Sequence, residues 1–154
     1  MKFMMNGAVT VGTLDGANVE MHQVLGDENI FLFGLKAEEA AALSRHYDPK
    51  LLYDRDPVLR RVLDGIRDGF RDGVSYEDIY RRLLFGDNCP ADQYLLLADF
   101  VSYCDAGRRM IDTYGHRERW NQISLHNIAR SGGFAADRAI RDYARDIWHV
   151  PCKE

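Results

Sequence analysis

Hydrophobic residues run together or alternate in three short segments, and this pattern predicts three short β-strands. Residues 8–13 (AVTVGT) alternate β-branched and small side chains, whereas residues 29–34 (NIFLFG) form an apolar run that ends in glycine. Residues 94–98 (YLLLA) are the third such run. β-Branched and aromatic residues favour strands, and an unbroken apolar run indicates a strand buried on both faces of a parallel sheet.

Elsewhere apolar residues recur every three or four positions, which is the spacing of an amphipathic helix. The clearest example starts at Asp56-Pro57, where an N-cap residue precedes a proline in the first turn. Asp15 and Asp99 are predicted to cap two further helices, and the Asp48-Pro49 pair is predicted to end one. The expected helices cover residues 16–25, 36–46, 57–68, 75–85, 100–114, 118–130 and 136–149.

The order of these elements, with a strand, a tight turn and a helix at the start, predicts an α/β fold. Complete doubly wound domains need more parallel strands than three to cover their helices. We therefore expect a partial doubly wound parallel sheet of about three short strands with many helices. Ligands of such sheets bind at the carboxyl ends of the strands.

Lys2 is the candidate for chemistry, because it lies between Met1 and Phe3 with Met4 and Met5 close behind. A lysine held among apolar side chains loses hydration of its ammonium group, which lowers its pKa and makes the nucleophilic neutral amine available. Schiff-base formation with an aldehyde cofactor requires such an amine. The alternative is a lysine whose stem covers the edge of a core while its charge stays in water. The residues alone leave both interpretations open.

Composition excludes several other classes of protein. The net charge of −4 argues against a general nucleic-acid binder, because neutralising phosphates requires a basic surface. No apolar run reaches the roughly 20 residues that cross a bilayer. The three cysteines, Cys89, Cys104 and Cys152, do not suggest a disulfide framework, and we expect a reducing cytoplasm. His149 and Cys152 lack a second pair of ligands, so we do not interpret them as a metal site.

The first 21 residues, MKFMMNGAVTVGTLDGANVEM, closely resemble the pyridoxal-phosphate lysine segment of the α-glucan phosphorylases, which act on glycogen, starch or maltodextrin. The resemblance continues in order along nearly the whole chain. Its further matches are residues 28–34 (ENIFLFG), 53–55 (YDR), 97–100 (LADF), Trp120, 127–131 (NIARS) and 137–148 (DRAIRDYARDIW).

The resemblance implies that residues 1–154 are the carboxy-terminal portion of the cofactor-binding domain of a two-domain GT-B-type glycosyltransferase. Lys2 would hold pyridoxal 5′-phosphate as a Schiff base, as an anchor that takes no part in bond cleavage. The cofactor's phosphate would act on the substrate phosphate. The implied reaction of the full enzyme uses phosphate to release glucose 1-phosphate from the ends of an α-1,4-glucan, and a homodimer of the family type is consistent with it.

The sequence also departs from the family. There, a glycine-rich run before the lysine and a separate amino-terminal domain complete the cleft, and neither is present in these 154 residues. We therefore expect this chain alone to be inactive. Two other interpretations stay open: a truncated, non-catalytic copy that packs on a partner through its final helix, and a free-standing cofactor-binding domain.

The final helix carries an expectation of its own. The family's last helices reach over the amino-terminal domain, so the apolar stripe with Tyr143, Ile147 and Trp148 should lack its partner here. We expect it to form an exposed patch or a self-association surface.

Overall fold

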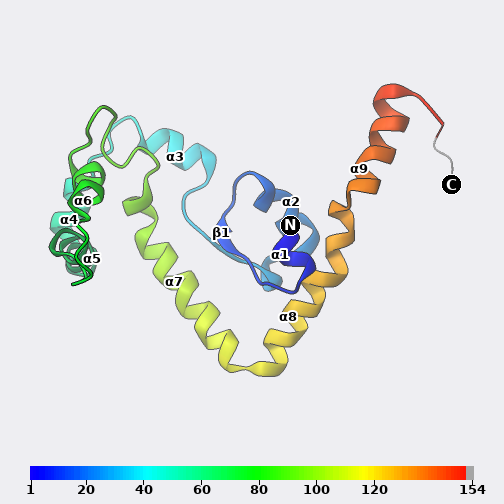
Figure 1. The fold of residues 1–154 in the computed structure, drawn as a ribbon, viewed down its shortest axis with the longest axis horizontal. Coiled ribbons are helices and arrows are strands. Elements are labelled where there is room, and N and C mark those ends of the chain that lie inside the picture. The colour runs from blue at the N-terminus through cyan, green and yellow to red at the C-terminus, as the bar shows by residue number, and fades with distance from the viewer. Residues whose placement is uncertain (152–154) are drawn as a thin grey trace. The chain divides into compact units, whose positions relative to one another are not determined.

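The computed structural model describes residues 1–151 and is mostly helical (Figure 1). The first part of the chain forms α1 (Lys2–Met5), β1 (Val11–Thr13), α2 (Ala17–Leu25), η1 (Asp27–Asn29) and β2 (Phe31–Phe33). The middle forms α3 (Ala37–Leu43), α4 (Pro49–Arg55), α5 (Pro57–Asp68) and α6 (Glu77–Leu84). The last part forms α7 (Leu96–Gly115), α8 (Arg117–Arg130), η2 (Ser131–Phe134), α9 (Ala136–Tyr143) and η3 (Ala144–Trp148).

The chain divides into two compact units. The first comprises Met1–Leu32 and the chain from Ala106 onward, and the second comprises Phe33–Asp105. Each unit has a hydrophobic cluster of its own.

In the first unit, β1 and β2 form a two-stranded parallel sheet, and the Phe31 amide donates to the Thr10 carbonyl at 2.9 Å. Helices α1, α2 and α8 pack around a cluster of Met4, Met21, Leu25 and Ile30. The two strands confirm the first two predicted strands in shorter form. Helix α2 ends at Gly26 as expected, but Asp15 does not cap it and instead accepts a hydrogen bond from Thr13 Oγ1 at 2.9 Å.

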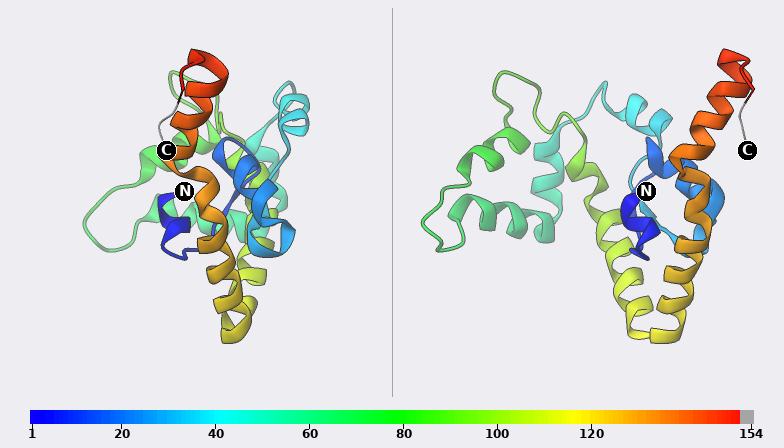
Figure 2. Two further views of the ribbon diagram at one scale, coloured as in Figure 1. Left: turned by 90° about the vertical axis from the view of Figure 1, so that its right-hand side faces the viewer. Right: turned by 45° about the vertical axis from the view of Figure 1, so that its right-hand side comes forward.

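In the second unit, α5 and α6 lie side by side and are joined by a loop (Figure 2). Leu59 and Leu63 of α5 and Leu84 of α6 form a leucine cluster with Leu97 at the start of α7. The start of α5 is as predicted, because the Asp56 carboxylate accepts from the amides of Val58 and Leu59. The Asp48-Pro49 pair, which was predicted to end a helix, instead begins one. Asp48 caps α4, whose first residue is Pro49, so the same Asp-Pro pair begins a helix that the prediction missed.

The third predicted strand, residues 94–98, is wrong. Tyr94 lies in a turn, the Leu95 amide donates to the Asp92 carbonyl at 2.8 Å, and α7 begins at Leu96. The helix forms here because the Asp92 carboxylate accepts from the Leu96 amide at 2.9 Å and from the Leu97 amide at 2.8 Å, which satisfies two donors that a helix start leaves free. Asp99, the predicted cap, accepts instead from the Leu35 amide at 2.8 Å. The sheet of the described residues thus has two strands, where about three were expected.

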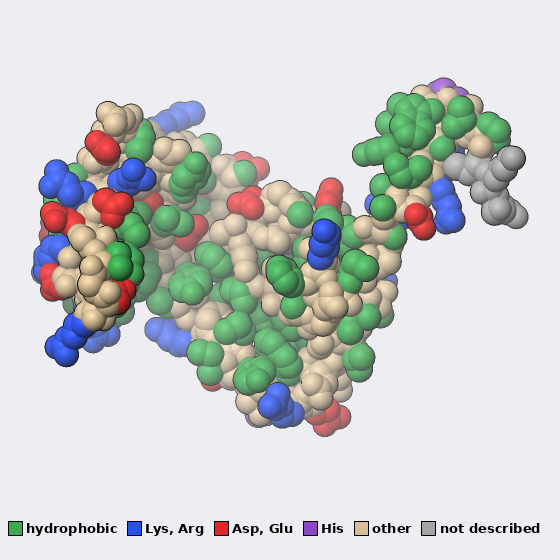
Figure 3. Space-filling view, viewed as in Figure 1, with side chains coloured by type: hydrophobic (Ala, Val, Ile, Leu, Met, Phe, Trp, Pro, Cys, Tyr) green, Lys and Arg blue, Asp and Glu red, His purple; other side chains and the backbone are tan. Residues whose placement is uncertain are grey.

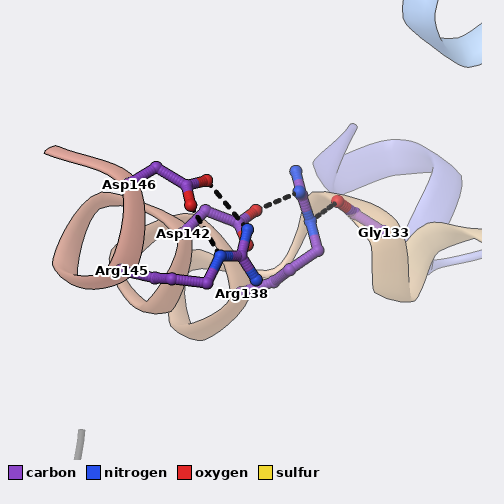
Figure 4. Close-up of polar contacts among 5 residues, drawn as sticks. All are labelled: Gly133, Arg138, Asp142, Arg145 and Asp146. Carbon is purple, nitrogen blue, oxygen red and sulfur yellow. Dashed lines mark hydrogen bonds and ion pairs between the residues drawn. The ribbon is translucent and has the colours of Figure 1, made fainter. Parts of the chain in front are cut away.

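Helix α9 continues into the π-helical turn η3, and ion pairs run along one side of both (Figure 4). Arg138 pairs with Asp142 at 2.6 Å and donates to the Gly133 carbonyl, while Arg145 contacts both Asp142 and Asp146. Arg145 holds the pKa of Asp146 below its ordinary value. These exposed pairs contribute little stability each, but they mark the polar side of the helix.

The other side of α9 and η3 is apolar and exposed (Figure 3). Residues five apart lie on different sides of an α-helix, because each turns by about 100°. The wider turn of η3 brings Trp148 against Tyr143, with ring centroids 6.0 Å apart. Trp148 remains 55% exposed, which confirms the predicted exposed patch. We call the surface of Ile140, Tyr143, Ile147 and Trp148 the final-helix face.

Candidate functional site

Lys2 is the first residue of α1, a single helical turn that precedes β1. The turn is closed by hydrogen bonds from the Gly7 amide to the Met4 carbonyl and from the Ala8 amide to the Phe3 carbonyl, each at 3.0 Å. Asn6 Nδ2 donates to the Lys2 carbonyl at 2.9 Å. The backbone of Lys2 is therefore held within its own turn, independently of where its side chain lies.

The turn is attached to the rest of the unit by Met4, which is 1% exposed in the cluster with Met21, Leu25 and Ile30. Lys2 lies outside this cluster, and its side chain is exposed, as are those of Phe3 and Met5. The apolar enclosure predicted around the Lys2 ammonium is therefore not built by its neighbours in sequence. The spacing explains this result, because one short helical turn can direct only one of these side chains fully into a core.

The Lys2 amine suits the covalent attachment of an aldehyde cofactor in one respect. Its side chain is exposed, and its ammonium group makes no hydrogen bond or ion pair with the described residues, so an aldehyde can reach it. Phosphate recognition is different. Lys2 is the only lysine or arginine in the first 35 residues, so this segment has no second cation for a phosphate group. The segment fits the anchoring of such a cofactor and leaves its phosphate to other residues.

The loop after β1 lies at the carboxyl end of that strand and holds its shape through short polar contacts. Asn18 Nδ2 donates to the Thr13 carbonyl at 2.9 Å, next to the Thr13–Asp15 contact. Asp15 therefore has a structural role, because its carboxylate helps to hold the shape of this loop. Farther along, His22 Nε2 lies 2.6 Å from Asp27 Oδ1, which joins α2 to η1 at the surface.

Helix α8 supplies two residues that contact this region; neither was assigned a role from sequence, although Asn127 opens the matching segment 127–131. Ser124 Oγ donates to the Gly7 carbonyl at 2.8 Å, and fully buried Asn127 donates to the carbonyls of Asn29 and Ile123 at 3.0 Å. The Asn127 Oδ1 atom is buried without a protein partner among the described residues. Ser124 is 117 positions away from Gly7, and no local pattern could have paired them.

Other candidate sites are not supported by the part of the chain that the structure describes. Within residues 1–151, no group of three His, Cys, Asp or Glu side chains is placed to hold a metal ion. Cys152, which the sequence places near His149, lies outside the described residues. Cys89 and Cys104 are free thiols. None of the described helices is both long and apolar enough to span a bilayer.

Comparisons with known proteins agree with the resemblance of the first segment. The family model for carbohydrate phosphorylases matches residues 1–150. Glycogen phosphorylase of Chlamydia pneumoniae is 44% identical over 99% of this chain, and that of Bacillus subtilis (strain 168) is 43% identical over 97%. The liver form of human glycogen phosphorylase is 40% identical over 97% of the chain.

The match covers only part of each relative. This chain corresponds to 18% of the Chlamydia and human proteins and to 19% of the Bacillus protein. Within that part, the match includes Lys2, the strand and loop that follow it, and the final helix. On these grounds, the chain belongs to the carbohydrate phosphorylase family.

Proposed function

We propose that this chain is the carboxy-terminal part of a pyridoxal-phosphate-dependent α-glucan phosphorylase, in which Lys2 anchors the cofactor. The observation that carries the proposal is the 21-residue segment around Lys2 in a chain that belongs to this family. The Lys2 side chain is exposed, so an aldehyde can reach its amine, but the apolar surroundings expected around the ammonium group are not formed by the described residues.

In this proposal the residues of the chain bind and orient. Lys2 Nζ forms the covalent attachment, and the α1 turn fixes the backbone from which that side chain extends. When bound, the cofactor supplies a phosphate group that acts on the substrate phosphate while an α-1,4-glucan end is cleaved to glucose 1-phosphate. No residue of this chain is assigned to bond cleavage.

We further propose that the chain alone is inactive and that its partners in the full enzyme are the remaining polypeptide, α-1,4-glucan and phosphate. The single cation among the first 35 residues supports this view, because two phosphate groups would have to be bound during the reaction. A homodimer of the family type is part of the proposal. So is a cytoplasmic location, which the free thiols of Cys89 and Cys104 support.

The first experiment tests the anchor. The purified chain is incubated with pyridoxal 5′-phosphate and reduced with borohydride, and the modified lysines are mapped by peptide mass spectrometry. We expect Lys2 to carry more adduct than Lys36, Lys50 or Lys153. The Lys2→Arg variant retains the charge and cannot form the attachment, so it should lose the main adduct only. Equal labelling of all four lysines would contradict a role for Lys2.

The second experiment tests the reaction. The chain is mixed with the amino-terminal part of a related glycogen phosphorylase, together with glycogen, phosphate and pyridoxal 5′-phosphate. We expect glucose 1-phosphate from the mixture, none from either part alone, and none from a mixture that contains Lys2→Arg. Product formation by the isolated chain would disprove the proposed inactivity.

A second candidate function is an accessory module that packs on a partner protein. The observation that favours it is the final-helix face, whose four apolar side chains are all about half exposed or more. This candidate requires no cofactor. It is preferred if the labelling experiment finds no preference for Lys2.

A further inference from the structure

The α1 turn needs support from outside itself. It contains four residues, and a single helical turn is not stable alone, because its nucleation fixes several backbone angles for few hydrogen bonds. Burial of Met4 supplies one attachment. A second attachment just beyond the carboxyl end of the turn would fix the direction of the turn as well as its position.

Helix α8 provides that second attachment. Ser124 Oγ donates to the Gly7 carbonyl at 2.8 Å, in a partly buried contact. Gly7 has a φ of +79°, and a Cβ atom at this position would lie 2.4 Å from Ser124 Oγ and 3.2 Å from Ile128 Cδ1. Only glycine combines this backbone conformation with so close an approach of α8.

The two attachments lie on the carboxyl side of Lys2 and bracket the end of its turn. Met4 fixes the turn in the core, and Ser124 fixes the carbonyl that follows it. Asn6, between the two, donates to the Lys2 carbonyl at 2.9 Å. The direction in which the Lys2 side chain leaves the backbone is thereby linked to α8.

We propose that Ser124 is a positioning residue for Lys2, acting through the hydrogen bond from its hydroxyl to the Gly7 carbonyl. This inference rests on the proposed function, because it gives Ser124 a role in presenting the Lys2 amine to an aldehyde cofactor. Ser124 touches neither Lys2 nor the reacting atoms. Its effect is on the conformation of the turn.

The first measurement is amide hydrogen exchange at Ala8, whose hydrogen bond to Phe3 closes the turn. Ser124→Ala removes the donor and should speed this exchange about fivefold, the factor that corresponds to one hydrogen bond. Ser124→Thr keeps the hydroxyl and should restore the slow exchange. Thr113→Ala is the matched control, because Thr113 Oγ1 donates to the Arg109 carbonyl at 2.7 Å, a contact within α7 that involves neither α1 nor α8.

The second measurement is the ratio of pyridoxal 5′-phosphate adduct at Lys2 to that at Lys36 in the same molecule after borohydride reduction. We expect this ratio to fall at least about twofold in Ser124→Ala and to recover in Ser124→Thr, because orientation of a reactive group affects its rate. If Ser124→Ala keeps the wild-type ratio, the positioning role of Ser124 is disproved, even if exchange at Ala8 becomes faster. That result leaves the proposed function unaffected. Equal labelling already in the wild type would contradict the proposed function and this inference together.

Discussion

Single side chains in this protein stabilise structure by serving several backbone groups at once, and Asp92 is the clearest case. It is 4% exposed and accepts from the amides of Leu96 and Leu97 and from the hydroxyl of Tyr47, the last at 2.6 Å. A buried carboxylate is stable only when such donors replace its lost water. Tyr47 therefore completes the cap of α7 from a distance of 45 residues.

This contact makes stability depend on pH in the alkaline range. Burial, and the hydrogen bond to Asp92 after it, raise the pKa of Tyr47 well above its ordinary value. The unfolded chain loses this proton near pH 10 while the folded chain keeps it, so stability is fully present below about pH 10 and falls as the pH rises further. Tyr47→Phe should lower the free energy of unfolding by about 1 kcal/mol near neutral pH. It should also reduce the loss of stability above about pH 10.

Urea unfolding from about pH 8 to 11 measures both the loss of stability in Tyr47→Phe and the fall of wild-type stability at alkaline pH. The hydrogen bond to Asp64 raises the pKa of Tyr53 to about 12, so only the difference between wild type and variant isolates Tyr47. Tyr94→Phe is the control, because Tyr94 is highly exposed. Parallel stability curves for the wild type and Tyr47→Phe would show that the contact is not formed in solution.

A second prediction at the residue scale separates backbone strain from steric clash. Gly86 and Gly73 both have φ near the left-handed region, at +72° and +79°. A Cβ at Gly86 would lie 2.4 Å from the Cys89 carbonyl oxygen, whereas nothing lies within 4 Å at Gly73. Gly73→Ala should lower the free energy of unfolding by about 1 kcal/mol, because of backbone conformation alone. Gly86→Ala should lower it by at least about 2 kcal/mol more, because of the added clash. Equal losses of unfolding free energy in the two variants, measured in urea, would contradict a steric clash at Gly86.

At the scale of elements, the leucine cluster holds α5 and α6 together, because the exposed ion pairs of Arg67 with Asp64 and Asp68 lie within α5 alone. Leu63→Ala should destabilise the second unit by about 3 kcal/mol, because it removes apolar contacts and leaves a cavity. Val62 is its neighbour but is 43% exposed, so Val62→Ala should cost less than about 1 kcal/mol. Hydrogen exchange of the α5 amides distinguishes the two, and comparable acceleration in both variants would contradict the assigned core.

The elements that sequence could predict are those whose signals are local. Asp56-Pro57 and Gly26 bound helices as expected, because capping depends on neighbouring residues. The run 94–98 was misassigned because a short apolar segment fits a strand or a buried helix equally well, and the distant Tyr47–Asp92 contact decided between them.

The candidate site was predictable to a similar extent. Lys2 was chosen as the candidate from its segment and its role stays a prediction, whereas its exposure depends on what surrounds it in three dimensions. The same holds for the Ser124–Gly7 contact, which joins residues 117 positions apart.

At the scale of the whole chain, the apolar surface is distributed unequally between buried clusters and the final-helix face. Each unit buries its own cluster, yet Ile147 stays 62% exposed and has no apolar core residue against it in the described chain. Such a surface binds hydrophobic dyes or other molecules and adds nothing to the folding of the chain that carries it.

A charge placed on the final-helix face should weaken the binding of other molecules to it. Ile147→Lys should reduce the fluorescence of a bound hydrophobic dye and shift sedimentation velocity profiles towards the monomer, while the free energy of unfolding changes by less than about 0.5 kcal/mol. Leu125→Lys on α8 is the matched control, because Leu125 is equally exposed, at 65%, but lies outside the face. If both variants reduce dye binding equally, the final-helix face has no special role. If Ile147→Lys unfolds the chain, the residue belongs to the core and the assignment of an exposed face is wrong.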